Sequence, residues 1–197
     1  MSFSTFFKDN RSILNSYPEI KIKIEELIET KDYVASLYYA SMKDSVEVIK
    51  ALLDNKVDVN SKYICGCISL HSASGYGNLG AMKTLINNQA DVNAKNDFGN
   101  TPLHYSTTSK RLKAVALLIN NGAEVNVKNN LNETPLHSAS KSGNLDMVKY
   151  LVECGACLES LDNGGNKPID LTRNEEIRKY LFNAKQTMDE PDMLICF

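Results

Sequence analysis

Apolar residues recur along this chain with helical spacing, in short runs that polar residues separate. Two of the clearest runs are Leu112, Val115, Leu118 and Ile119, and Leu145, Val148, Leu151 and Val152. This spacing places the apolar side chains of each run on one face of a helix. Asn121-Gly122 and Cys154-Gly155 follow the two runs, and a glycine there favours a left-handed cap that ends the helix. The pattern predicts amphipathic helices with Leu118 and Leu151 in the core.

A second, shorter helix is predicted before each apolar run. Pro102 and Pro135 suit the first turn of a helix, where the N–H that proline lacks would have no partner. Thr101 and Thr134 precede them and can act as N-cap residues. Small residues follow, as in Ser138-Ala139-Ser140, and would let a neighbouring helix approach closely. Together these features predict pairs of antiparallel helices.

Two phrases repeat along the chain with a common period. Thr101-Pro102-Leu103-His104 recurs 33 residues later as Thr134-Pro135-Leu136-His137. The second phrase keeps the same period: Asp58-Val59-Asn60, Asp91-Val92-Asn93 and Glu124-Val125-Asn126. Two signals in one register indicate an array of repeats rather than a single mixed core.

A 33-residue period with this T-P-L-H phrase resembles the ankyrin-repeat family. The resemblance covers residues 30–184, and it implies an all-α solenoid of stacked helix-turn-helix units joined by short β-hairpin loops. Each such unit is too small to bury its own apolar face, so stacking is obligatory. The units are expected at 30–62, 63–95, 96–128 and 129–161, with a shortened C-terminal cap at 162–184.

Both ends of the chain depart from the repeat. Residues 1–29 contain an amphipathic helix through Ile20, Ile24 and Leu27, which we expect to cap the first repeat. A partner-binding helix is the alternative for this segment. Residues 185–197 are expected to form a flexible tail.

Composition and charge exclude several classes of partner. The formal net charge of −2 gives no basic surface for nucleic acid or for an anionic membrane. No apolar run is long enough to span a bilayer, and residues 1–7 lack the features of a signal peptide. Five irregularly placed cysteines argue against a disulfide framework. We therefore expect a cytoplasmic monomer, or a protein of the host cytosol if it is a secreted effector.

The sequence offers few candidates for catalysis or metal binding. The three histidines all occupy one repeat position: His71, His104 and His137. The resemblance implies that they bond between neighbouring loops, which leaves no histidine as a general base. Cys65 and Cys67 could bind zinc with Cys154 and Cys157, but two repeats separate the pairs by roughly 20 Å. One ion, with Zn–S bonds of about 2.3 Å, cannot join them, so we expect no cofactor, no metal and no enzymatic activity.

The predicted function is the binding of a protein partner. Stacked units curve, and the loop tips and first helices line the concave side. The candidate partner-binding residues there are Ile64, Cys67, Tyr76, Asp97, Phe98, Asn100, Thr108, Asn130, Leu131, Glu133 and Lys141. We expect Tyr76, Phe98 and Leu131 to lie in one row as apolar anchors. A regulatory inhibitor, or a pathogen effector that occupies a host protein, is the alternative.

The chain could also be a substrate of a modifying enzyme. Asn60, Asn93 and Asn126 each follow a valine, with a leucine eight residues earlier. This resembles the pattern that asparaginyl hydroxylases modify in ankyrin-repeat proteins. We expect these side chains to be structural first, bonding locally to stabilise the hairpin.

Overall fold

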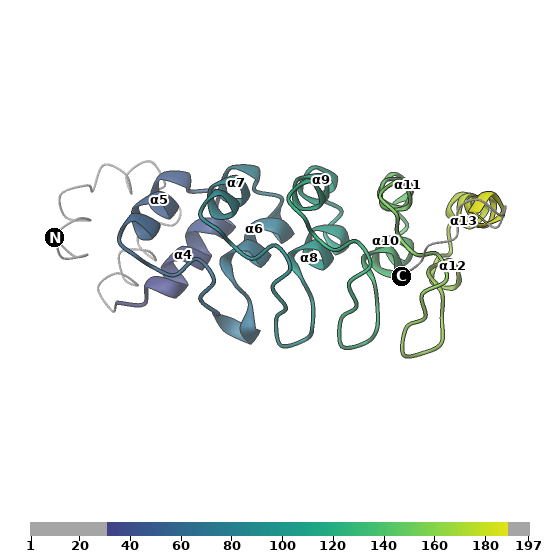
Figure 1. Cartoon of the computed structure of the whole chain (residues 1–197), viewed down its shortest axis with the longest axis horizontal. Helices are drawn as coiled ribbons and strands as arrows, with labels where there is room; N and C mark the ends of the chain where they lie inside the picture. The colour runs from purple at the N-terminus through teal and green to yellow at the C-terminus, as the bar shows by residue number, and fades with distance from the viewer. Residues whose placement is uncertain (1–30, 189–197) are drawn as a thin grey trace.

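The structure, a computed structural model, describes residues 31–188 as an elongated row of helix pairs (Figure 1). The first helices of the pairs are α4 (Tyr33–Met42), α6 (Ser69–Tyr76), α8 (Pro102–Thr108), α10 (Pro135–Ser142) and α12 (Pro168–Leu171). The second helices are α5 (Val46–Asp54), α7 (Leu79–Asn87), α9 (Leu112–Asn120), α11 (Leu145–Glu153) and α13 (Glu175–Met188). We call these two sets the inner and the outer helices. The predicted N-terminal capping helix lies outside the described residues.

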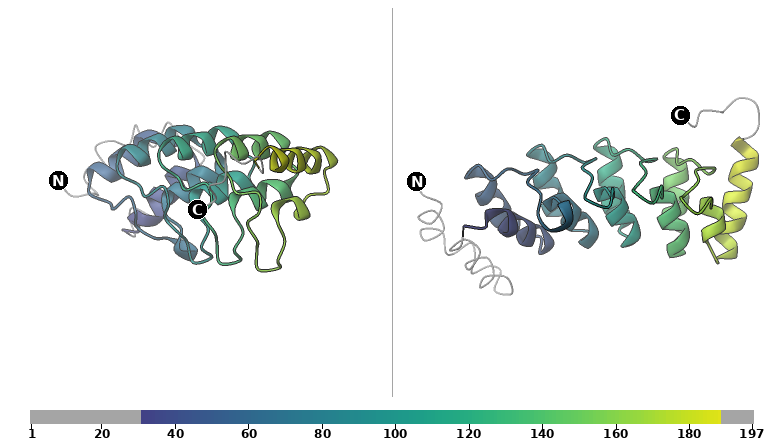
Figure 2. Two further views of the ribbon diagram at one scale, coloured as in Figure 1. Left: turned by 45° about the vertical axis from the view of Figure 1, so that its right-hand side comes forward. Right: turned by 90° about the horizontal axis from the view of Figure 1, so that it is seen from below.

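The pairs follow one another in chain order along the long axis, and long loops project from one side (Figure 2). Inner helices pack on inner helices, as α6 does on α4 and α8, while α9 packs on α7 in the outer layer. The predicted helical array is therefore confirmed.

The inner helices begin as the sequence predicts. Pro135 occupies the first turn of α10, and the hydroxyl of Thr134 accepts the N–H of His137 at 3.5 Å. At the other end, Gly143 adopts a left-handed conformation with φ of 70°. This geometry ends α10 and turns the chain into the outer helix.

The core lies between the two helical layers. One leucine from each of four outer helices is fully buried: Leu52, Leu85, Leu118 and Leu151. Burial of one such side chain stabilises the fold by about 1.5–3 kcal/mol before the entropy cost of folding is counted. The predicted core positions of Leu118 and Leu151 are confirmed.

The loops between the pairs are hairpin-shaped, but no strand forms within residues 31–188. One backbone hydrogen bond closes each loop, as Asn96 N–H does with the carbonyl of Asn100 at 3.0 Å. Neighbouring loops are also joined, since Asn130 N–H donates to the carbonyl of Phe98 at 3.0 Å. Gly99 permits this approach, because a Cβ there would lie 2.4 Å from Asn130 Oδ1. In place of the expected β-hairpins there are tight loops, which form hydrogen bonds within each loop and between neighbouring loops.

The C-terminal unit differs from the others in both of its helices. Its inner helix, α12, has 4 residues, whereas α8 has 7 and α10 has 8. Its outer helix, α13, has 14 residues and continues to Met188, past the expected end of the array at residue 184. Ile177 and Leu181 are buried and anchor α13 on the core. Because α13 ends at Met188, residues 185–188 of the expected tail are helical.

Candidate functional site

The three histidines bridge successive repeats. Nδ1 of His104 accepts the N–H of Thr101 at 3.2 Å, so the ring proton lies on Nε2. Nε2 donates to the carbonyl oxygen of Glu133 in the next repeat at 3.1 Å. The equivalent bonds join His71 to Asn100 at 3.0 Å and His137 to Asn166 at 3.2 Å. The structural role implied by the resemblance is confirmed.

Burial keeps two of these rings neutral. His71 and His104 are both buried, and desolvation lowers the pKa of each below its usual value. Backbone carbonyls that accept from these rings oppose the shift but do not reverse it. Both nitrogens of each ring are already occupied, so neither ring is placed to act as a general base.

The Val-Asn asparagines also connect repeats. Asn93 Nδ2 donates to the carbonyl of Gly122 at 3.0 Å, and Asn93 Oδ1 accepts the N–H of Glu124 at 2.9 Å. Asn60 and Asn126 make the same two bonds to the repeats that follow them. The expectation of local bonds within a hairpin was therefore wrong, because these partners lie about one repeat further along the chain.

Cys67 was expected on the binding surface but is 3% exposed. Its Sγ lies 3.1 Å from the hydroxyl of Tyr105, and the amide of Asn96 donates to both groups. Burial, together with the contact to Cys67, raises the pKa of Tyr105. The sulfur is thus enclosed between two repeats and cannot contact a partner.

The other described cysteines are Cys65, Cys154 and Cys157. Cys65 is exposed at the loop tip, while Cys154 and Cys157 follow the end of α11 two repeats away. Within residues 31–188, no three histidine, cysteine or acidic side chains are grouped so that they could hold a metal ion.

Three apolar side chains are exposed at the loop tips. Ile64 is 62% exposed, Phe98 57% and Leu131 59%, although large apolar side chains are usually buried. Phe98 and Leu131 occupy the same position in successive repeats, and Ile64 is one position earlier. We call these three residues the tip row.

Tyr76 does not belong to the tip row. It is the last residue of α6, at the opposite end of the inner helix from the loop that precedes it. Its register equivalents are Ser109 and Ser142, not Phe98 and Leu131. The side chain is exposed, but the predicted single row with Phe98 and Leu131 is wrong.

The other candidate residues divide by exposure. Asp97, Thr108, Asn130 and Lys141 are exposed, whereas Asn100 and Glu133 are half-buried. Lys141 Nζ lies 3.7 Å from a carboxylate oxygen of Glu133. Because Lys141 is largely exposed to solvent, this ion pair is weak and leaves the ammonium group available to a partner.

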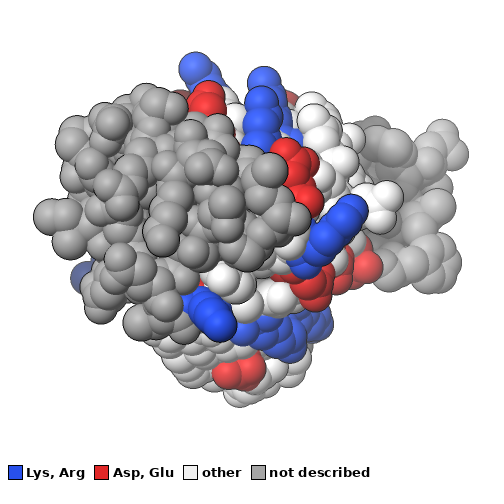
Figure 3. All heavy atoms as spheres, turned by 90° about the vertical axis from the view of Figure 1, so that its left-hand side faces the viewer, with Lys and Arg blue, Asp and Glu red and all other residues white. Residues whose placement is uncertain are grey.

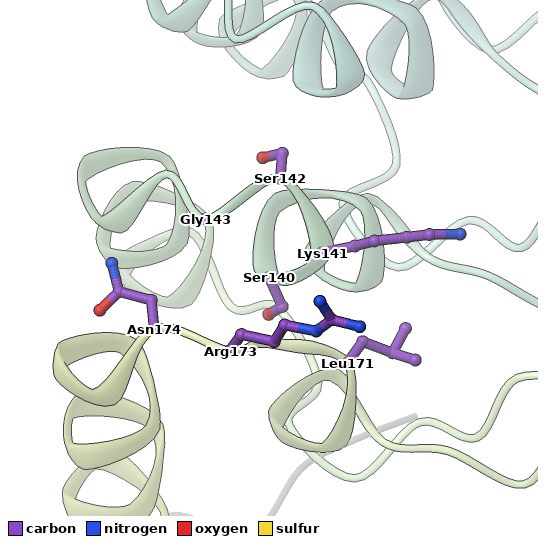
Figure 4. Close-up of a pocket in the computed structure, with 7 residues that line it drawn as sticks. All are labelled: Ser140, Lys141, Ser142, Gly143, Leu171, Arg173 and Asn174. Atoms are coloured by element: carbon purple, nitrogen blue, oxygen red, sulfur yellow. The ribbon is translucent and has the colours of Figure 1, made fainter.

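A cavity of about 640 Å³ opens between α10, α12 and the start of α13 (Figure 4). Its lining residues are Ser140, Lys141, Ser142, Gly143, Leu171, Arg173 and Asn174. Lys141 was predicted from the sequence to contact a partner, whereas Leu171, Arg173 and Asn174 were not. The shortened last unit was the available signal, because a missing turn of helix leaves its neighbour uncovered.

Charge gives no sign of a nucleic-acid or membrane surface at the N-terminal end of the array. Cationic and anionic side chains are interspersed over the described part of that end (Figure 3). Among the helices described here, none combines the length and apolar character needed to cross a bilayer.

Two family models match the chain. The first, described as ankyrin repeats (3 copies), matches residues 37–129, and the second, ankyrin repeats (many copies), matches residues 107–152. Together they span residues 37–152, more than half of the 197 residues. No curated protein shows a match to the chain.

Proposed function

Because the chain belongs to the ankyrin-repeat family, we propose that it is a non-enzymatic module that binds a protein partner through its loop tips and inner helices. Ankyrin repeats generally mediate interactions between proteins. The proposal for this chain is more specific, since it assigns the main contacts to Ile64, Phe98 and Leu131.

The tip row is the observation that carries the proposal. Exposed apolar side chains in adjacent positions are common at protein interfaces, and aromatic residues are frequent among the strongest anchors. Phe98 and Leu131 lie on loops whose backbones are hydrogen bonded to each other, which keeps the two side chains neighbours.

The loops are also ordered before any partner arrives. The backbone bond between Asn130 and Phe98 and the bridge from His104 to Glu133 hold adjacent loops together. A partner therefore binds a surface whose conformational entropy was already lost on folding, and less of the binding energy is spent on ordering it.

The test is a Phe98→Ala, Leu131→Ala double variant, used as bait in affinity capture from the native host with identification by mass spectrometry. We expect wild-type protein to capture a partner and the double variant to lose it, because truncating an interface anchor can cost about 2 kcal/mol or more. The free energy of unfolding should change by less than about 1 kcal/mol, since both side chains are exposed.

A matched control uses the same residue types outside the tip row. Phe182 is 56% exposed and Leu161 47%, so a Phe182→Ala, Leu161→Ala variant removes similar exposed area elsewhere. This control should capture the partner as wild type does. Undiminished capture by a folded Phe98→Ala, Leu131→Ala variant would contradict the proposal.

The identified partner also separates a scaffold from a regulatory inhibitor or effector. If the partner is an enzyme and saturating amounts of this chain suppress its activity, the inhibitor role is supported. If its activity is unchanged, the chain acts as a scaffold.

Hydroxylation of Asn60, Asn93 and Asn126 is a separate hypothesis. The amide of Asn93 is engaged at both its nitrogen and its oxygen, so an enzyme would first have to open this link between repeats. Incubation with an asparaginyl hydroxylase, followed by peptide mass spectrometry, should show one added oxygen at Asn93 or Asn126. Absence of that mass change would remove the hypothesis.

A further inference from the structure

We propose that the cavity beside α10 is a subsite for an acidic side chain of the partner, held by Lys141 and Arg173. This inference rests on the proposed function and names the chemistry of the partner segment. A volume of about 640 Å³ is within the range of about 300–1,000 Å³ that is common for ligand sites. It can hold the side chain of an aspartate or glutamate together with water.

The cavity exists because the last inner helix is truncated. In the preceding repeats the next inner helix is longer, with 7 residues in α8 and 8 in α10. The 4-residue α12 ends at Leu171, and Arg173 and Asn174, which follow it, line the cavity together with the last residues of α10. Ser140, Lys141 and Ser142 are therefore left facing a cavity rather than another helix.

The charges that line the cavity are all positive. Among the described residues, Lys141 from α10 and Arg173 from the turn after α12 are the only charged ones that line it. Figure 4 shows both side chains extending toward the same side of the site. Within residues 31–188, Arg173 has no carboxylate at ion-pair distance, and a guanidinium group binds a carboxylate with two parallel hydrogen bonds.

An unpaired hydroxyl lies beside these charges. Ser140 is fully buried, and its Oγ has no hydrogen-bond partner among residues 31–188; Figure 4 shows its side chain near Arg173. The equivalent Ser74 and Thr107 hydroxyls are also unpaired, but of these three positions only Ser140 lines the cavity. Because this oxygen is fully buried, Ser140 forms part of the cavity wall, and Lys141 and Arg173 supply the donors for a carboxylate.

The nearest acidic residues do not neutralise the site. Glu133 contacts Lys141 at the long distance of 3.7 Å, and the Lys141 side chain is 68% exposed. Glu175 and Glu176 are exposed in the first turn of α13 and do not line the cavity. Because the Glu133 side chain is only 20% exposed, a partner carboxylate would share the exposed ammonium group of Lys141 with Glu133 rather than displace it.

The positive charge continues along the same edge of the array. Lys110 and Arg111 are exposed at the turn that follows α8, one repeat earlier. Arg111 lies across Gly77, where a Cβ would approach its Cδ to 2.9 Å, so the glycine leaves room for the arginine. An acidic segment of a partner could contact both turns, with one of its side chains in the cavity.

The experiment uses the full chain and an array of short synthetic peptides printed in matched pairs. In each pair the second peptide replaces every aspartate by asparagine and every glutamate by glutamine. We expect acidic peptides to bind about tenfold or more tightly than their amide counterparts, and this preference to weaken as salt is added. Equal binding of both members of the pairs would overturn the proposal.

A Lys141→Gln, Arg173→Gln variant should lose the preference for acidic peptides. Lys83→Gln, Lys113→Gln is the matched control, because it makes the same change in net charge at exposed positions of α7 and α9. Amide NMR signals of Ser140, Lys141, Arg173 and Asn174 should shift when an acidic peptide is added to wild-type protein. An unchanged preference in the Lys141→Gln, Arg173→Gln variant, or shifts confined to other repeats, would overturn the proposal.

The failure of this inference can be distinguished from the failure of the proposed function. If Phe98→Ala, Leu131→Ala abolishes partner capture while Lys141→Gln, Arg173→Gln leaves both capture and acidic-peptide preference intact, the binding module stands and the acidic subsite is rejected. If neither double variant affects capture, both are rejected.

Discussion

Nε2 of His104 lies 3.1 Å from the carbonyl oxygen of Glu133, which is 29 residues further along the chain and in the next repeat. Nδ1 of the same ring accepts the N–H of Thr101, so one imidazole holds the start of its own helix and the next loop. A proton added to Nδ1 would face the Thr101 N–H. The bond from Thr101 to Nδ1 therefore requires a neutral ring, whereas Nε2 donates to Glu133 in either state.

This requirement predicts that acid destabilises the array. Burial lowers the pKa of His71 and His104 in the folded state, so the unfolded chain binds protons more readily near the ordinary histidine pKa of about 6.5. The stability that depends on neutral rings is fully present above about pH 6.5 and is lost as the pH falls toward the folded-state values. Urea unfolding between about pH 7 and pH 5 should show the free energy of unfolding decreasing.

A His104→Gln variant provides the control for that titration. It should be less stable than wild type near neutral pH, because a buried link between repeats is altered. Its free energy of unfolding should depend less on pH, since one titrating group is gone. An unchanged pH dependence in this variant would show that other groups cause the acid sensitivity.

Leu118→Ala should lower the free energy of unfolding by about 2–5 kcal/mol, because the side chain is fully buried between the helical layers. The comparison variant is Leu131→Ala, which removes the same atoms from a loop tip and should cost less than about 0.5 kcal/mol. Both are measured as shifts in the urea midpoint. Equal midpoints for the two variants would contradict the assignment of Leu118 to the core.

Asn93→Ala should lower the free energy of unfolding by about 1–2 kcal/mol. It removes the donor to Gly122 and leaves the N–H of Glu124 without its acceptor. Asn93→Asp keeps an acceptor for Glu124 but not the donor to Gly122, so its effect should lie between those of wild type and Asn93→Ala. If thermal unfolding shows Asn93→Asp to be less stable than Asn93→Ala, the two hydrogen bonds of Asn93 do not explain its contribution to stability.

Cys65 and Cys67 should differ sharply in reactivity, because Cys65 is exposed at a loop tip and Cys67 is buried beside Tyr105. Brief alkylation of native protein, followed by peptide mass spectrometry, should modify Cys65 and spare Cys67 until the chain is unfolded. We also expect the purified, untagged protein to contain no zinc after dialysis. Stoichiometric zinc would contradict the separation of the two cysteine pairs.

The sequence predicted the parts of the fold that follow from the period. Leu118 and Leu151 are core residues because their position recurs on the buried face of every outer helix. The three histidines all link neighbouring repeats because they occupy the same position of the repeat. Exposure of Phe98 and Leu131 could be predicted for a similar reason. A loop tip contacts only its neighbours in the stack, so a large apolar side chain there remains in solvent.

Features that depend on a single neighbour could not be predicted in this way. Cys67 is buried because Tyr105, which stands where the two adjacent repeats have Ser72 and Ser138, reaches across to it. Tyr76 was predicted to occupy a tip-side position of its repeat, although its register places it at the end of α6. The cavity depends on the residue at which α12 ends. The charged residues of the C-terminal unit predicted a cap for the array, but they did not predict a cavity between that cap and α10.

The backbone hydrogen bonds between loops all run in one direction. The unit at residues 96–128 donates one bond to the preceding unit and accepts an equivalent bond from the following unit. Asp97 N–H donates to the carbonyl of Cys65, and the carbonyl of Phe98 accepts from Asn130. A duplicated copy of this unit, inserted after Lys128, would find the same donors and acceptors on both sides. Gene duplication could therefore lengthen such a protein without changing the backbone bonds between loops, and selection on the copies could then diversify the tips.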